Sequence, residues 1–228
     1  MPFTLEQVVP WGRSYDEYLR MFRLTEADLA GAVLGCADGP AAFNAEAARR
    51  GLRVTSCDPV YRFSREELAR RVEETYGTIM EQLRRNTDAY LWEEFRTPEE
   101  VGATRMAAMR LFLEDFDQGR NAGRYLDAEL PELPFPRAHF DLALCSHFLF
   151  LYSDHLTLEF HLASLRELAR VATEVRVFPL LTLGGEPSPY LTPLLTTLTE
   201  EGYQVAVESV AYEFQRGANR MLRIQAPG

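Results

Sequence analysis

The stretch Val33–Glu46, VLGCADGPAAFNAE, joins a short apolar run to a helix-forming one through a turn that holds Gly35 and Gly39. Glycine-rich turns that bind nucleotides usually follow the patterns G-x-G-x-x-G or G-x-x-x-x-G-K-[ST]. Ala37 stands between the two glycines here, so the turn matches neither pattern. The surrounding residues predict a buried strand, a turn and a helix that starts at Pro40, where the missing N–H costs nothing.

The segments that follow the turn extend this unit and then interrupt it. Residues 53–57 (RVTSC) predict a second strand, which would complete a parallel, right-handed strand–helix–strand unit. Residues 62–123 then form a helical insertion, with helices expected at 64–85, 88–95 and 97–116. Ser64 and Glu67 form a capping box at the start of the first of these helices.

Strands and helices alternate again after residue 123. The last two strands are separated by a short turn, which predicts an antiparallel hairpin. We therefore expect residues 1–228 to form one α/β domain with a doubly wound, Rossmann-like seven-stranded sheet, parallel except for an antiparallel terminal hairpin strand. The later strands are expected at residues 124–129, 140–150, 174–181, 204–214 and 220–225, with helices at 153–171 and 188–202.

Composition limits the chemistry that this chain can perform. All 24 basic residues are arginine, and the absence of lysine excludes a triphosphate P-loop and a Schiff-base enzyme. A net charge of −10 disfavours bulk nucleic-acid binding without excluding it. No apolar run reaches 18 residues and no signal pattern is present, which predicts a cytoplasmic protein without membrane association. Free thiols are expected at Cys36, Cys57 and Cys145.

Residues 30–61 and 124–225 resemble a class I S-adenosylmethionine-dependent methyltransferase. GCADG is similar to the G-x-G-x-G turn of that family, and CDPVY puts Asp58 where the family keeps an acid for the ribose hydroxyls. LDAELPELPF is similar to the stretch in which an aspartate followed by alanine contacts adenine. The resemblance implies S-adenosylmethionine as co-substrate, held by Arg13, Gly35, Cys36, Ala37, Asp38, Gly39, Asp58, Pro59, Asp127, Ala128 and Ser146.

The two downstream aspartates each have a functional and a purely structural interpretation. Asp58 follows Gly39 by 19 residues, at the end of a strand, and its carboxylate suits a ribose diol. It would otherwise cap the turn before Pro59. Asp127 would accept a hydrogen bond from the adenine amino group while the Ala128 N–H faces a ring nitrogen. Otherwise it is a simple turn residue.

The chain departs from the family pattern at two positions of the turn. Val33 stands where the family usually carries an acid, and Ala37 replaces the middle glycine, which it can do if its φ is negative. Asp38 is a candidate to replace the lost acid by holding the amino group of the methionine moiety. Arg13 is a candidate for the methionine carboxylate, because a guanidinium matches a carboxylate bidentately, and is otherwise an ordinary surface arginine.

Candidates for the catalytic step lie near the end of the fourth strand. His147 is either a general base or a residue that packs against the co-substrate. Tyr61 and Tyr152 flank the same place and could position an acceptor. The signature N-P-P-[YF] of amino-group methylation is absent at CSHF, which disfavours that class. The remaining histidines lack ligand spacing, so no metal site is expected.

The insertion at 62–123 is either a cover over the acceptor pocket, with Tyr90, Trp92 and Arg105 contributing specificity, or a dimer interface. The leading hypothesis is methyl transfer to a small or medium-sized acceptor. The alternatives are an enzyme acting on RNA or protein, and a non-catalytic module that binds S-adenosylmethionine. The sequence predicts neither the acceptor, nor the methylated atom, nor the oligomeric state.

Overall fold

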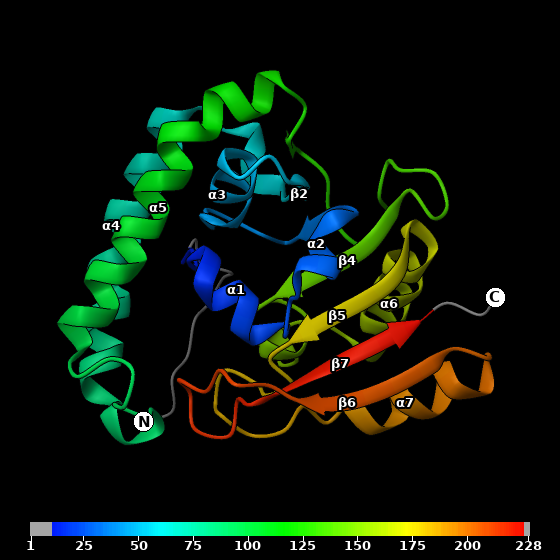
Figure 1. The fold of residues 1–228 in the computed structure, drawn as a ribbon. Helices are drawn as coiled ribbons and strands as arrows, with labels where there is room; N and C mark the ends of the chain where they lie inside the picture. Colours follow the sequence, from blue (N-terminus) through cyan, green and yellow to red (C-terminus); the bar gives the residue numbers. More distant parts are fainter. Residues whose placement is uncertain (1–10, 226–228) are drawn as a thin grey trace.

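A seven-stranded sheet crosses the molecule in the computed structural model, which describes residues 11–225 (Figure 1). The strand order is β3-β2-β1-β4-β5-β7-β6; β7 runs antiparallel to both β5 and β6, and the other strand pairs are parallel. The predicted fold class is therefore confirmed. The strands are β1 (Ala32–Cys36), β2 (Arg53–Cys57), β3 (Tyr125–Leu126), β4 (Phe140–Ser146), β5 (Ala172–Phe178), β6 (Gln204–Ser209) and β7 (Arg220–Gln225).

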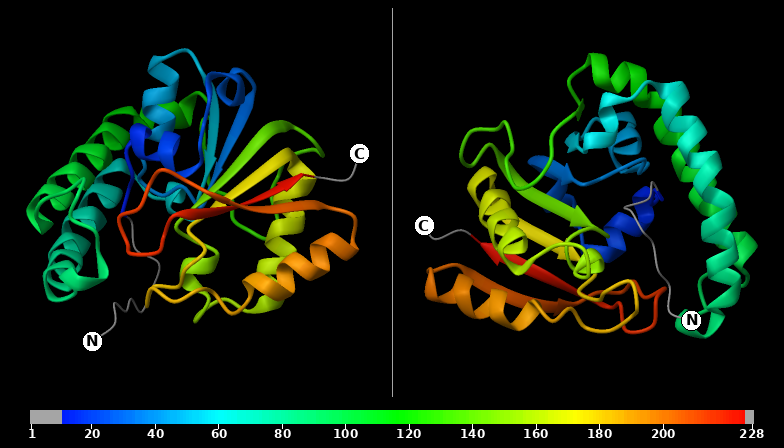
Figure 2. Two further views of the ribbon diagram at one scale, coloured as in Figure 1. Left: turned by 60° about the horizontal axis from the view of Figure 1, so that its bottom comes forward. Right: turned by 180° about the vertical axis from the view of Figure 1, so that it is seen from behind.

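Helices cover both faces of this sheet, as Figures 1 and 2 show from opposite sides. Alternate residues of a strand point to opposite faces, so Val33 joins one apolar core and Leu34 the other. The first core is completed by α1 (Tyr15–Met21), α2 (Glu26–Ala30) and α3 (Phe43–Arg49). The second is completed by α6 (Leu158–Val171) and α7 (Leu191–Glu200).

The order in which successive strands are added to the sheet reverses between β1 and β4. From β1 the chain moves outward to β2 and β3, and it then returns to place β4 on the other side of β1. The ends of the three central strands are level, because Cys36 pairs with both Cys57 and Cys145. Open α/β sheets bind ligands at the carboxyl ends of such strands. The fold therefore directs the search for a site to residues that follow these three cysteines.

The helical insertion forms a long antiparallel pair beside the β3 edge of the sheet (Figure 1). After η1 (Pro59–Arg62), it contains α4 (Arg65–Arg85), η2 (Thr87–Ala89) and α5 (Pro98–Asn121), and α5 packs against α3 and β3. The capping box of Ser64 and Glu67 is present as expected. None of the helices formed by residues 11–225 is both long and apolar enough to span a bilayer.

Several local predictions are wrong. The strands expected at 124–129, 140–150 and 204–214 end early, at Leu126, Ser146 and Ser209, and the helix expected at 153–171 begins only at Leu158. The helix expected at 88–95 does not form beyond η2, because this segment is tied to the loop between β6 and β7, where Leu91 N donates to Phe214 O at 2.8 Å. Helix α3 starts at Phe43 instead of Pro40. The residues in between extend the turn after β1, and Ala42 N donates to Arg13 O at 2.9 Å.

Candidate functional site

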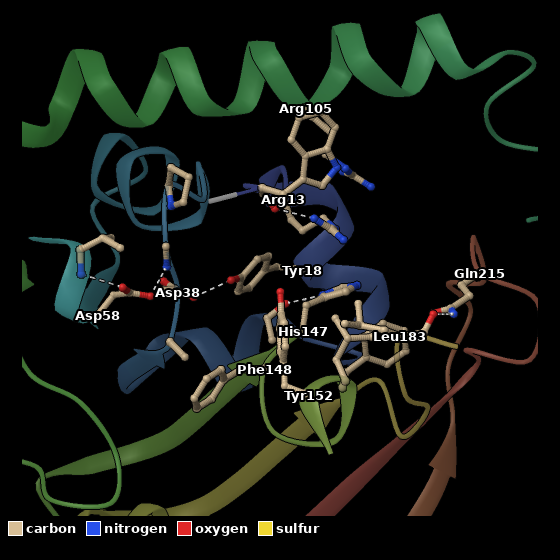
Figure 3. Close-up of a pocket in the computed structure, with 18 of the residues that line it drawn as sticks. Arg13, Tyr18, Asp38, Asp58, Arg105, His147, Phe148, Tyr152, Leu183 and Gln215 are labelled. Atoms are coloured by element: carbon tan, nitrogen blue, oxygen red, sulfur yellow. Dashed lines mark hydrogen bonds between the residues drawn. The ribbon is translucent and has the colours of Figure 1, made fainter. Parts of the chain in front are cut away.

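A cavity of about 640 Å³ lies at the carboxyl ends of β1, β2, β4 and β5 (Figure 3). Its volume is in the range of small-molecule sites. The strand ends contribute residues 37–40, 58–60 and 146–148 to its wall. Other segments close it: residues 11–18 before and within α1, one face of α4 and α5, and the loop between β6 and β7. Figure 3 shows Asp38 and Asp58 on one side of the cavity and Leu183 and Gln215 on the other.

In the turn after β1, two residues have a positive φ, one of which the sequence did not predict. Ala37 has a φ of +54° and Gly39 a φ of +52°, so the expectation of a negative φ at Ala37 is wrong. The left-handed conformation costs a non-glycine residue about 1–2 kcal/mol. It lets Ala37 N donate to Cys57 O at 2.9 Å, which ties the turn to the end of β2.

Gly35 leaves space for a side chain of the turn after β1. A Cβ on this residue would come within 2.2 Å of Asp38 Oδ2, so glycine leaves room for the carboxylate to fold back over the strand end. Cys36 is buried in the core with its thiol beside Cys57. Neither residue lines the cavity, so the predicted direct contact of Gly35 and Cys36 with a co-substrate is not supported.

Asp38 reaches the cavity but is already engaged by two hydroxyl groups. Tyr18 donates to its Oδ1 at 2.5 Å and Ser56 to its Oδ2 at 2.6 Å. Burial raises the pKa of Asp38, while the Ser56 and Tyr18 hydrogen bonds act in the opposite direction. Each carboxylate oxygen keeps a further lone pair. The role of Asp38 toward a ligand amino group thus stays a prediction.

Asp58 caps a turn and also faces the cavity. Its Oδ2 accepts from Gly39 N and its Oδ1 from Val60 N, both at 2.9 Å, so it joins the turn after β1 to η1. Burial raises the pKa of Asp58 to about 6. The two interpretations of this residue are therefore compatible, and Pro59 beside it also lines the cavity.

Asp127 does not lie in the cavity wall. Its side chain is 51% exposed, and its Oδ1 lies 3.8 Å from Arg62 Nε. Strand β3 ends one residue earlier, at Leu126, and the chain turns so that Ala128 and Glu129 face the cavity instead. This placement does not support the adenine contact expected of Asp127, which stays a prediction. Glu129 was missed because no sequence pattern singled it out.

Arg13 lies in the wall of the cavity, so the alternative of an ordinary surface arginine is wrong. Its guanidinium donates to Trp11 O at 2.5 Å, and its Nε is buried without a hydrogen-bond partner among the described residues. Burial, followed by repulsion from Arg105, lowers the pKa of Arg13 to about 10. No carboxylate within residues 11–225 forms an ion pair with it, so the site has a cation that suits an anionic ligand group.

A second buried cluster closes the cavity beside Arg13. Arg105 of α5 donates to Glu17 of α1 and, at 3.2 Å, to the hydroxyl of Tyr212, which itself donates to Glu17 Oε1 at 2.9 Å. Burial raises the pKa of Glu17, but Arg105 and Arg13 more than offset it and hold the pKa at about 2. The sequence singled out Arg105 alone, because its partners lie 88 and 107 residues away.

His147 follows β4 with a φ of +53°, a conformation that turns its ring toward the cavity (Figure 3). Its backbone N–H donates to Phe178 O at 2.6 Å, and its Nδ1 lies 2.9 Å from Ser146 Oγ. Burial, then Arg13 and Arg105, hold the pKa of His147 well below its usual range. A strained backbone at a ligand cavity is typical of functional residues. Ser146 and Tyr152 also line the cavity.

Tyr61 is not part of the cavity wall. Its side chain is buried against Phe112, Phe116 and Tyr125, and its hydroxyl donates to Gly39 O at 2.7 Å. The hydroxyl of Tyr61 thus contacts the backbone of the turn after β1, and the structure does not support a contact of this residue with an acceptor. No group of three or more His, Cys, Asp or Glu side chains that could hold a metal ion occurs in the described part of the chain.

Comparison with known proteins relates the chain to one close sequence relative and to a widespread fold. No family model matches the sequence. The uncharacterised protein MJ0045 of Methanocaldococcus jannaschii is 34% identical over 223 residues, which are 97% of this chain and 98% of that protein. The crystal structure of mitomycin 7-O-methyltransferase MmcR matches with a TM-score of 0.51 at 13% identity, over 93% of this chain and 53% of MmcR. This match shows a shared fold.

Magnesium protoporphyrin IX methyltransferase from Synechocystis PCC 6803, crystallised with bound SAH, gives a looser match. The TM-score is 0.48 at 15% identity, over 88% of this chain and 76% of that one. A likeness this loose carries no argument about activity. What the site does must follow from its own residues.

Proposed function

This chain belongs to the protein family of MJ0045 and has the class I methyltransferase fold. From this premise we propose that it transfers the methyl group of S-adenosylmethionine to a small or medium-sized acceptor. The observation that carries the proposal is the cavity at the strand ends, whose wall contains the Asp58 carboxylate and the Arg13 guanidinium. This guanidinium has no ion-pair partner among the described residues. These groups suit a nucleoside joined to an amino acid.

The cavity offers a partner for each part of this co-substrate. Asp58 would accept hydrogen bonds from the ribose hydroxyls, and Ala128 would lie against the adenine ring. Arg13 would hold the methionine carboxylate, and Asp38 would accept from the amino group. When bound, the co-substrate supplies a methyl group already activated by its sulfonium. The protein must then position the acceptor at about 3–3.5 Å and remove its proton where needed.

The remaining wall favours a small acceptor. Ile79, Leu83 and Val101 of the insertion and Phe214 of the loop between β6 and β7 present an apolar surface to the cavity. Three segments far apart in sequence enclose this space, which disfavours a protein or RNA strand as acceptor. We therefore assign residues 62–123 as a cover over the acceptor, the alternative being a dimer interface.

Two of the three insertion residues singled out for acceptor specificity line the cavity, namely Tyr90 and Arg105. Trp92 does not reach it. Its Nε1 donates to Thr87 O at 2.9 Å, and its ring packs edge-on against Phe214. Its contribution is therefore to hold the cover against the loop between β6 and β7.

One observation favours a second candidate function, a module that binds S-adenosylmethionine without catalysis. Val33 is fully buried in the core, so it supplies no polar group to a ligand, and Ala37 adds a methyl group to the turn. A screen for labelled-methyl transfer from S-adenosylmethionine into small-molecule, RNA and protein fractions separates the candidates. Transfer into the small-molecule fraction is expected. A protein that binds the co-substrate but labels no fraction would be a binding module, contrary to the proposal.

A further inference from the structure

Two uncharged polar side chains from distant segments lie side by side in the wall of the cavity. Tyr90 directly follows η2 in the insertion, Gln215 lies in the loop between β6 and β7, and the two residues form an isolated antiparallel bridge. The hydrogen bonds of this bridge, at 2.8 and 2.9 Å, join the residues on either side of the pair. Tyr90 and Gln215 are thus a pair without mutual backbone hydrogen bonds, in which opposite side chains come closest. Both residues line the cavity.

The Tyr90 hydroxyl has no hydrogen-bond partner among residues 11–225, although only 9% of the residue is exposed. Its ring is held in place by stacking on Phe214, with the ring centroids 4.7 Å apart and the planes inclined by 21°. Burial raises the pKa of Tyr90 to about 12, while Arg13 acts in the opposite direction, so the hydroxyl keeps its proton at neutral pH. A buried tyrosine hydroxyl usually has a hydrogen-bond partner. In this position a ligand would supply it.

Gln215 has one free acceptor beside this hydroxyl. Its Nε2 lies 3.4 Å from Leu183 O, and Figure 3 shows the two residues in contact. A carbonyl oxygen only accepts, so the NH2 end of the amide must face Leu183. Gln215 Oε1 is then the free end, and it has no hydrogen-bond partner in the described part of the chain. Together the two side chains offer a hydroxyl that can donate and an amide oxygen that can accept.

The charges near this pair are already paired or would be neutralised by the co-substrate. Within residues 11–225, the insertion and the loop between β6 and β7 contribute one charged side chain to the cavity wall, Arg105, which Glu17 neutralises. The charge of Arg13 would be neutralised by the methionine carboxylate. An acceptor charge buried against Tyr90 would therefore lose its hydration without gaining a counter-ion. The pair suits an uncharged group.

The surface that adjoins the pair is apolar. The insertion adds Ile79, Leu83 and Val101 to the cavity wall, and Leu183 lies beside Gln215 (Figure 3). Burying a hydrocarbon body against such side chains is favourable. The wall thus fits a molecule that combines an apolar body with one uncharged polar group.

We propose that Tyr90 and Gln215 select the acceptor, and that it is an apolar molecule with an uncharged amide-type group, either a carboxamide or a lactam. This inference rests on the proposed function. The carbonyl of such a group would accept from the Tyr90 hydroxyl, and its N–H would donate to Gln215 Oε1. A carboxylate has no hydrogen to donate to Oε1, and an ammonium group has no lone pair to accept from Tyr90.

The test compares aromatic probes that differ only in this group, namely benzamide with benzoate and the corresponding pair built on naphthalene. Each is titrated into the wild-type protein with excess S-adenosylhomocysteine, and its affinity is read from backbone amide chemical-shift changes at pH 7.5. We expect each carboxamide to bind at least tenfold more tightly than the carboxylate of the same size. Equal affinities, tighter binding of the carboxylates, or no shift with either carboxamide at millimolar concentration would overturn the proposal.

Two variants test the pair itself. Tyr90→Phe keeps the stacking on Phe214 and removes the hydroxyl, and Gln215→Met keeps the length of the side chain and removes the amide. Each is expected to weaken the binding of the carboxamides about fivefold. Tyr203→Phe is the matched control, because Tyr203 is partly buried outside the cavity, and it should bind them as the wild-type protein does. Unchanged carboxamide affinity in both Tyr90→Phe and Gln215→Met would contradict the role of the pair.

Calorimetric titration with S-adenosylhomocysteine separates this inference from the proposed function, because it reports co-substrate binding and needs no acceptor. The affinity should stay within about threefold of the wild-type value in Tyr90→Phe and Gln215→Met, which also shows that both variants fold. Co-substrate binding without a preference for carboxamides would remove the acceptor class and keep the methyltransferase. A preference for carboxamides in a protein that does not bind S-adenosylhomocysteine would instead remove the methyltransferase and keep the pair as a ligand site.

Discussion

The Asp58 carboxylate accepts hydrogen bonds from Gly39 and Val60 and still faces the cavity. Because burial raises its pKa to about 6, this carboxylate becomes protonated as the pH falls through about 6, where most carboxylates are still ionised. A protonated carboxyl is a poorer acceptor for a ribose diol. We therefore expect the affinity for S-adenosylhomocysteine to fall as the pH is lowered from 7.5 to 5, with most of the change near pH 6.

Calorimetry on Asp58→Asn measures this dependence. The variant should bind at least tenfold more weakly at pH 7.5, a loss of about 1.4 kcal/mol, and its affinity should vary little with pH. Asp141→Asn is the matched control, because Asp141 also accepts a backbone N–H, from Ala32, but lies at the opposite end of the strands. An unchanged pH profile in Asp58→Asn would exclude this carboxylate from ribose binding.

The positive φ of Ala37 predicts the effect of restoring a glycine there. Removal of the left-handed penalty, about 1–2 kcal/mol, outweighs the greater chain entropy of glycine, about 0.5–1 kcal/mol. Ala37→Gly is thus expected to raise the free energy of unfolding by about 0.5–1 kcal/mol in urea titrations. Ala138→Gly, at a φ of +51° away from the cavity, should give a similar gain. A loss of stability in Ala37→Gly alone would show that its methyl group packs favourably in the turn.

At the scale of elements, the contact of Glu17, Arg105 and Tyr212 joins α1, α5 and the loop between β6 and β7. Arg105→Met would leave the Glu17 carboxylate buried without its main partner, which costs about 3–5 kcal/mol in comparable cases. Urea unfolding measures this cost. Glu17→Gln combined with Arg105→Met should recover a large part of it, because the cluster then no longer holds a buried carboxylate that has lost its main partner.

An exposed ion pair provides the control for this prediction. Arg166 and Glu201 pair on the surface between α6 and the end of α7, and Arg166→Met should cost less than about 1 kcal/mol.

The contribution of Glu17 to stability also has a defined pH range. Since its pKa in the folded protein is about 2, below the value of an unfolded chain, this stability is present above about pH 4 and is lost as the pH falls toward 2. An Arg105→Met variant as stable as Arg166→Met would contradict the account of the cluster.

Elements with local signals were predictable from the sequence, and elements fixed by distant partners were not. Helix α4 begins at its capping box because Ser64 and Glu67 are three residues apart. The segment that follows η2 has helical spacing, yet its backbone pairs with residues more than 120 positions away. Propensity cannot anticipate such pairing.

Site residues next to strand ends were likewise predictable from the sequence, whereas those brought in by distant segments were not. Asp58 and Ala37 stand next to strand ends that the apolar pattern reveals. Tyr18 is an unremarkable helix residue in the sequence, and it enters the site only because α1 packs over the turn after β1. Asp127 was assigned from the motif, but the two-residue length of β3 places it outside the cavity.

At the scale of the whole molecule, the sheet brings its strand ends to one edge, and the insertion and the loop between β6 and β7 close the space above them (Figures 1 and 3). The strand ends and the segment before α1 hold Asp38, Asp58 and Arg13, while Ile79, Leu83 and Val101 of the insertion are apolar. Under the proposed function, the co-substrate would bind at the strand ends and the acceptor against the insertion. Binding of the co-substrate should therefore depend on the strand ends and little on the apolar face of α4.

Calorimetric titration of S-adenosylmethionine into the wild-type protein, Asp58→Ala and Leu83→Ala tests the central claim most directly. We expect one site per chain in the wild-type protein, an affinity at least tenfold lower in Asp58→Ala, and an affinity within about threefold of the wild-type value in Leu83→Ala. Absence of binding to the wild-type protein, or equal affinity in Asp58→Ala, would contradict the account.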